Sequence, residues 1–133
     1  GIARGRYTEA DVHLLHSQIV EVLEEKNASI DEFYFCPHHP DYGRQLKCVC
    51  RKPQPGLLIE ASEKWTIDLT RSWMIGDKLI DVQAGKTAGV ETVLVRTGYG
   101  NRDISLADDD QRIADNLLAA VNEVVIPSLS SYK

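Results

Sequence analysis

Two apolar runs separated by one helix constrain the fold of this chain more strongly than any other feature. Residues 72–75 and 92–95 have the composition of short strands, and the second run is almost wholly apolar, as expected for a strand buried on both faces. Residues 79–88, between them, have a helical pattern. Strands that alternate with helices predict an α/β fold with a mostly parallel sheet. Ligands bind beyond the carboxyl ends of the strands in such sheets, and Asp77 lies at one such end.

The rest of the chain supplies further elements of the same kind. Thr8 is predicted to cap a helix that runs to about residue 26, and Pro55-Gly56 opens another that runs to about residue 64. The other predicted elements are a short aromatic strand at 33–35, a polar surface loop at 99–111, an edge strand at 112–114 and a last helix at about 116–125.

Length and charge narrow the class of protein. The chain has 133 residues, which suits a single domain over residues 1–133. It holds 15 Lys and Arg against 20 Asp and Glu, a net charge of −5, so we expect neither a nucleic-acid nor a membrane partner. No apolar run approaches the roughly 20 residues that a membrane helix needs. Three cysteines, an odd number, argue against a disulfide-stapled secreted protein, so we expect a cytoplasmic location. We expect a monomer if the chain is complete.

A loop at residues 36–50 carries the most specific motif. Its cysteines and histidines follow the spacing Cys-x-His-x9-Cys-x-Cys, which lets two pairs of ligands wrap one tetrahedral ion. The four candidate ligands are Cys36, His38, Cys48 and Cys50. Thiolates and an imidazole suit Zn²⁺, and four protein ligands leave no open position, so the predicted zinc is structural. His39 could replace His38, and the alternative is a set of reduced thiols and loop histidines without a metal.

Two adjacent cations, Arg51 and Lys52, come directly after this loop and before a predicted helix. An arginine fork and a lysine point charge together are typical of a phosphate-binding segment. The alternative is a solvated basic pair.

The segment Gly76–Asp81 carries the third motif. Gly76 allows a tight turn after the strand, and the carboxylate of Asp77 then suits Mg²⁺, which prefers hard oxygen ligands. Asp81 lies one helical turn further on the same side and could orient a water or a cation. The alternative is a helix-capping Asp followed by an ordinary surface Asp.

These motifs together resemble the haloacid dehalogenase superfamily. Gly76-Asp77 with Asp81, followed by Ala84-Gly85 and Ala88-Gly89, is similar to its fourth motif, and Lys52 in Arg-Lys-Pro matches its third-motif lysine. The loop Cys-Pro-His-His-Pro, followed by Cys-x-Cys-Arg-Lys-Pro-x-Pro-Gly, resembles the narrower family of D-glycero-D-manno-heptose 1,7-bisphosphate phosphatases, with the histidinol-phosphatase branch similar.

The resemblance implies a Rossmann-like sheet without a large cap domain and a Mg²⁺-dependent hydrolysis of a phosphorylated sugar through an aspartyl-phosphate. It implies that Asp77 binds Mg²⁺ and that Lys52 is catalytic and neutralises the phosphoryl oxygens. It also implies that Asp81 supports the site without contacting the substrate. It also implies that Arg51 and Lys78, like Lys52, contact the substrate, and that the Cys/His loop binds Zn²⁺.

The chain departs from the family at the nucleophile. The family's Asp-x-Asp follows the first, central strand, whereas Asp108-Asp109-Asp110 lies in an acidic loop with no apolar strand before it. We therefore expect residues 1–133 to be an N-terminally truncated haloacid dehalogenase-like domain that lacks the first central strand and is inactive and poorly folded by itself.

Three further interpretations remain. Histidinol-phosphate hydrolysis would use nearly the same residues. A zinc-stabilised module that binds phosphate without turnover would explain the missing nucleophile. A zinc-ribbon nucleic-acid module is disfavoured by the net charge of −5.

Overall fold

The computed structural model describes residues 1–43 and 47–130. The chain divides into two units, Gly1–Arg51 and Lys52–Lys133, and each is described separately. Three single-turn 3-10 helices accompany the longer elements, at Ile2–Arg4, Leu69–Arg71 and Ile104–Leu106.

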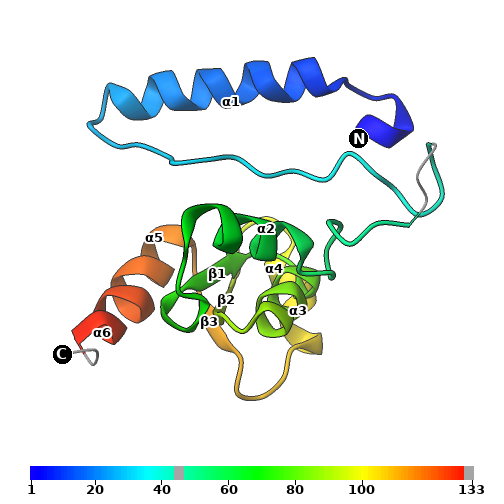
Figure 1. Ribbon diagram of the computed structural model, residues 1–133. Helices are drawn as coiled ribbons and strands as arrows, with labels where there is room; N and C mark the ends of the chain where they lie inside the picture. The colour runs from blue at the N-terminus through cyan, green and yellow to red at the C-terminus, as the bar shows by residue number, and fades with distance from the viewer. Residues whose placement is uncertain (44–46, 131–133) are drawn as a thin grey trace. The chain divides into compact units, whose positions relative to one another are not determined.

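The first unit is built on α1 (Glu9–Glu24), drawn in blue in Figure 1. Thr8 caps it as predicted, because its Oγ1 accepts a hydrogen bond from the Asp11 amide at 3.2 Å. Asp11 Oδ2 accepts in return from the Thr8 amide at 2.7 Å. This reciprocal capping box satisfies amides that the helix itself leaves unpaired.

The aromatic segment 33–35 does not form the predicted strand. Instead its rings contact α1: the Phe33 ring stacks on His16 with centroids 4.1 Å apart, and Phe35 meets His13 edge to face at 5.6 Å. Within residues 1–43 and 47–51 no backbone segment pairs with 33–35. The prediction was wrong because aromatic composition favours a strand only where a neighbouring strand completes the hydrogen-bond ladder.

The second unit contains a three-stranded parallel sheet in the order β1-β2-β3. Its strands are β1 (Trp73–Gly76), β2 (Glu91–Val95) and β3 (Arg112–Ala114). Ile75 is opposite Val93, and Val95 is opposite Ala114. The predicted α/β architecture and the edge strand at 112–114 are confirmed, and the central strand β2 is the most buried, with Val93 and Leu94 fully covered.

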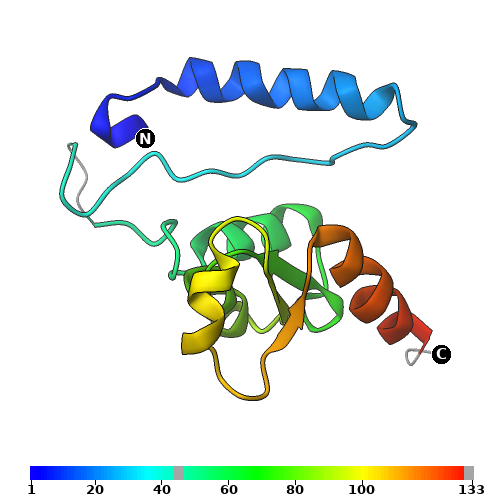
Figure 2. The same cartoon turned by 180° about the vertical axis from the view of Figure 1, so that it is seen from behind.

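Helices cover both faces of this sheet (Figures 1 and 2). On one face, α3 (Leu79–Ala88) approaches so closely that a Cβ on Gly85 would lie 2.6 Å from Thr92. On the other face, Val93 and Val95 pack with Ala120 of the C-terminal helix. The helix α2 (Gly56–Trp65), which begins after Pro55 as predicted, packs beside α3.

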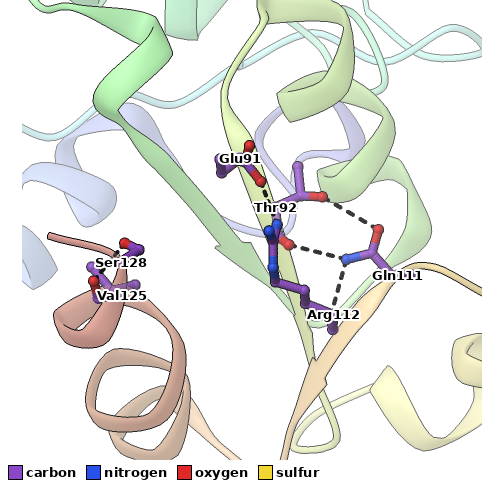
Figure 3. Close-up of polar contacts among 6 residues, drawn as sticks. All are labelled: Glu91, Thr92, Gln111, Arg112, Val125 and Ser128. Atoms are coloured by element: carbon purple, nitrogen blue, oxygen red, sulfur yellow. Dashed lines mark hydrogen bonds and ion pairs between the residues drawn. The ribbon is translucent and has the colours of Figure 1, made fainter. Parts of the chain in front are cut away.

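Polar contacts fix the register between β2 and β3 (Figure 3). The buried Gln111 side chain donates to the carbonyls of Thr92 at 3.2 Å and Arg112 at 3.0 Å, and its Oε1 accepts from the Thr92 hydroxyl at 3.3 Å. Arg112 also pairs with Glu91. These contacts hold a strand of only three residues in place.

Two predictions in the C-terminal half need correction. The segment 99–111 is not simply a surface loop, since it contains α4 (Gly100–Asp103) and the 3-10 turn after it. The last helix does not end near residue 125: α5 (Leu117–Ala120) continues through a π-helical stretch (Val121–Val125) into α6 (Ile126–Leu129). Pro127 lies directly after the π-helical stretch, in the first turn of α6.

No helix among residues 1–43 and 47–130 is both long enough and apolar enough to span a membrane.

Candidate functional site

The predicted metal ligands come together in the first unit. The ligand atoms of Cys36, His38, Cys48 and Cys50 all lie within 4.8 Å of one another. Cys36 Sγ is 3.6 Å from Cys48 Sγ and 3.0 Å from Cys50 Sγ. His38 Nδ1 is 3.7 Å from Cys36 Sγ and 3.2 Å from Cys50 Sγ. Zinc bonds of about 2.3 Å to sulfur and 2.0 Å to nitrogen give a tetrahedron with edges of about 3.6–3.8 Å, so this donor set fits Zn²⁺. Residues 44–46 of the loop lie outside the described residues.

Proton sharing among the thiols agrees with this donor set. Desolvation raises the pKa of Cys48, but hydrogen bonds from Cys50 and Cys36 outweigh it and lower the pKa to about 6. Desolvation and the neighbouring thiols Cys36 and Cys48 raise the pKa of Cys50 to about 12. Three thiols packed this closely cannot all ionise without a compensating cation.

The two adjacent histidines have different environments. His38 faces the thiols, whereas the buried His39 has its Nε2 2.9 Å from Arg4 Nη2 and its ring 4.9 Å from that of Tyr42. Desolvation, with the charge of Arg4, lowers the pKa of His39. Of the two histidines that sequence spacing left open, the structure therefore places His38 in the cluster.

Arg51 belongs to the same unit as this loop. Its Nη1 donates a hydrogen bond to the His38 carbonyl at 2.9 Å, so Arg51 stabilises the loop next to a candidate zinc ligand. Its predicted contact with substrate stays a prediction.

The second group of predicted residues lies at the carboxyl end of β1, in the other unit. Asp81, only 3% exposed, has Oδ1 2.5 Å from Lys52 Nζ, while its Oδ2 accepts from the Lys78 amide at 3.1 Å. The buried carboxylate thus fixes the position of the Lys52 ammonium group. Gly76 makes this close approach possible, because a Cβ there would lie 2.3 Å from that of Asp81.

Asp77 follows β1 directly and is half-buried. Its Oδ2 accepts a hydrogen bond from the Tyr99 amide at 2.9 Å, and within the described residues Oδ1 has no hydrogen-bond partner. A carboxylate held at one oxygen and open at the other, at the end of a parallel strand, suits Mg²⁺.

The turn after β2 supplies residues that the sequence analysis missed. Gly98 has a φ of +64°, and a Cβ there would lie 2.1 Å from Asp77 Oδ2. Tyr99 donates its amide to Asp77, and Asp103 Oδ2 accepts from the Leu79 amide at 2.9 Å. The available signal was position: Arg96-Thr97-Gly98-Tyr99-Gly100 follows a buried strand and so lies at the ligand-binding edge of the sheet.

Comparisons with known proteins identify the family of this chain. The family model described as "HAD-hyrolase-like" matches residues 49–120, more than half of the chain. The chain belongs to the haloacid dehalogenase-like hydrolases. A D-glycero-β-D-manno-heptose-1,7-bisphosphate 7-phosphatase of Salmonella typhi is 48% identical over 103 residues, which are 74% of this chain and 54% of that protein. The Pseudomonas aeruginosa enzyme of the same name is 34% identical over 126 residues, and the aligned region covers 95% of this chain and 68% of that protein.

A solved structure extends the similarity. The D,D-heptose 1,7-bisphosphate phosphatase of B. bronchiseptica, crystallised with magnesium and phosphate, aligns with a TM-score of 0.85 at 30% identity, over 96% of this chain and 70% of its own. These matches confirm the resemblance to haloacid dehalogenase-like heptose bisphosphate phosphatases. The chain spans about half the length of the first curated relatives that it matches.

Proposed function

We propose that this chain serves the magnesium-dependent hydrolysis of a phosphate monoester, with D-glycero-β-D-manno-heptose 1,7-bisphosphate as the substrate. One observation carries the proposal: the Lys52–Asp81 pair lies at the same strand end as Asp77, which keeps one carboxylate oxygen open. The names of the relatives and of the B. bronchiseptica structure support the choice of substrate. That structure aligns with 96% of the chain, which also supports one domain built from both units.

Each residue has a separate role in this proposal. Lys52 places its ammonium group against the phosphoryl oxygens and stabilises the charge that develops there. Asp81 holds that ammonium in position, since it is buried and its second oxygen is fixed by a backbone amide. Asp77 presents Oδ1 to Mg²⁺, which when bound supplies positive charge beside the phosphate. Arg51 and Lys78 contact the rest of the substrate.

The nucleophilic aspartate is not one of these residues. Asp108 pairs with Lys86 at 2.7 Å, and the run 108–110 precedes β3 instead of following a strand. The aspartyl-phosphate would therefore form on an aspartate outside these 133 residues, and this polypeptide alone is expected to be inactive.

We also propose that Cys36, His38, Cys48 and Cys50 hold a structural Zn²⁺. The donor set fits a closed tetrahedral site, and the loop that carries it has no helix or strand among its described residues. Thiols kept reduced for this purpose favour a cytoplasmic location.

The proposal is tested by calorimetric titration of the 133-residue chain with three ligands, inorganic phosphate, heptose 1,7-bisphosphate and histidinol phosphate, with and without Mg²⁺. We expect Mg²⁺-dependent phosphate binding that Asp77→Asn abolishes and that Asp115→Asn, a control at the end of β3, leaves unchanged. The heptose bisphosphate should bind more tightly than histidinol phosphate, and the reverse order would favour the histidinol branch.

Turnover is followed in the same samples by ³¹P NMR. We expect none from the chain alone. Phosphate release would contradict the assignment of the nucleophile outside these residues, and a lack of any Mg²⁺-dependent phosphate binding would contradict the site itself. Tight binding that never leads to turnover, even with an added Asp-x-Asp segment, would favour the non-catalytic binding module.

A further inference from the structure

Two cations gather on one aromatic ring beside Asp77. The Tyr99 ring, in a side chain that is half exposed, has Lys78 Nζ 3.9 Å from its centroid and the Arg102 guanidinium carbon 5.6 Å from it. The three residues come from two places, the end of β1 and the turn and short helix that follow β2. The negative face of the ring attracts both cations and so holds them near each other despite their like charge.

Four other cations of the same unit each have a carboxylate partner. Lys52, Lys86 and Arg96 pair with Asp81, Asp108 and Asp115, and Arg112 pairs with Glu91. By contrast, neither Lys78 nor Arg102 forms an ion pair with any residue in the described parts of the chain. In a chain of net charge −5, two neighbouring cations without carboxylate partners create a local positive potential, and this potential attracts an external anion.

The carboxylates of Asp77 and Asp103 each accept a hydrogen bond from a backbone amide. Asp77 Oδ2 accepts from the Tyr99 amide, and Asp103 Oδ2 accepts from the Leu79 amide at the start of α3. These bonds fix the turn that carries Tyr99 and Arg102 against the strand end. The two cations are therefore held at a set position next to Asp77.

We propose that Lys78, Tyr99 and Arg102 form a subsite for the second phosphate of a bisphosphate substrate. This proposal rests on the proposed function, because it places the second phosphate beside the group that is hydrolysed at Lys52 and Asp77. Arg102 supplies a bidentate guanidinium, Lys78 supplies a point charge, and the Tyr99 ring orients both. The subsite thus distinguishes a bisphosphate from a sugar that carries one phosphate.

The test compares heptose 1,7-bisphosphate with inorganic phosphate as ligands of the whole 133-residue chain in the presence of Mg²⁺. In the unchanged chain, the bisphosphate should bind at least tenfold more tightly than inorganic phosphate. Arg102→Gln should lower that ratio about tenfold, because it removes a charged hydrogen-bond donor. Tyr99→Leu should lower it in the same direction by releasing both cations.

Arg96→Gln is the matched control. It removes an exposed arginine that follows the same strand but already pairs with Asp115 at 3.2 Å, and it should change the ratio less than twofold. If the Arg102 variant keeps the full preference, or loses no more than the Arg96 variant, the subsite proposal is wrong while the proposed function stands. If inorganic phosphate itself shows no Mg²⁺-dependent binding, the proposed function is wrong.

Discussion

Replacing Gly98 by alanine should damage the Asp77 site in a way that a second glycine replacement can separate from general strain. Gly98 has a φ of +64°, and the added Cβ would lie 2.1 Å from Asp77 Oδ2. Real Cβ contacts are essentially never shorter than 3.0 Å, so the carboxylate must move by about 1 Å. That movement breaks its 2.9 Å hydrogen bond with the Tyr99 amide.

Gly89→Ala is the matched control for this change. Gly89 has a φ of +84°, but a Cβ there meets nothing within 4 Å. Both variants place alanine in the left-handed region, which costs about 1–2 kcal/mol of folding free energy. Only Gly98→Ala adds the loss of a solvent-exposed hydrogen bond, about 1 kcal/mol. The two variants should therefore differ in stability by only about 1 kcal/mol.

Metal binding should separate the two variants much more clearly. The assay follows Mn²⁺-induced broadening of the Tyr99 and Asp77 amide signals in NMR spectra, because Mn²⁺ reports weak oxygen sites at low concentration. We expect Gly98→Ala to weaken binding at least tenfold, since a ligand displaced by about 1 Å loses the geometry that the site provides. Gly89→Ala should bind as the unchanged chain does. Equal binding by both variants would refute the argument that Gly98 positions Asp77.

Three further predictions follow from individual contacts. His38→Gln should weaken zinc binding about 100-fold in chelator competition, because it removes one of four ligands that share a binding free energy of roughly 10–16 kcal/mol. His39→Gln should leave zinc binding unchanged. Equal losses of zinc affinity in the two variants would contradict the ligand assignment. Lys52→Met should lower the free energy of unfolding by about 1–3 kcal/mol in urea denaturation, because the buried Asp81 carboxylate loses its partner. Adding Asp81→Asn to this variant should restore part of the lost stability. No recovery of stability would argue against the pair. Backbone and side-chain hydrogen bonds from Thr8 lower the pKa of Asp11 below its ordinary 3.8. The protection factors of the amides at the start of α1, which are exchange rates corrected for the intrinsic effect of pH, should therefore be highest above that pH and fall as the pH falls through the lowered value; the Thr8→Ala variant should lack this step.

The two candidate sites differ in how far the sequence predicts them. The zinc ligands could be named because all four lie within fifteen residues, so their spacing alone limits where their side chains can meet. Asp77 and Asp81 could be named because both follow a predicted strand within one helical turn. Sequence spacing could not choose between His38 and His39, since that choice depends on the contacts of His39 with Arg4 and Tyr42.

The residues that the sequence analysis missed act over long sequence distances. Tyr99 lies 22 residues from Asp77, and Asp103 lies 24 residues from Leu79. Their roles depend on the parallel pairing of β1 with β2, which brings both strand ends to one edge. A polar segment such as 99–111 predicts a surface position correctly for most of its residues, but not which of its amides point at the site.

The strand predictions show the same limit. The run 92–95 is a strand because neighbours on both sides complete its hydrogen bonds and helices cover both of its faces. The equally suitable run 33–35 is not a strand, and its rings pack on His13 and His16. Composition indicates which segments can be strands, whereas a paired neighbour determines which of them are.

A crystal structure of the chain grown with Mg²⁺, Zn²⁺ and phosphate tests the central claim most directly. We predict a phosphate within hydrogen-bond distance of Lys52 Nζ, a magnesium ion on Asp77 Oδ1, and an anomalous zinc peak among Cys36, His38, Cys48 and Cys50. A phosphate-saturated crystal with no anion at Lys52 and no ion on Asp77 would contradict the account, even if zinc occupied the cysteine cluster.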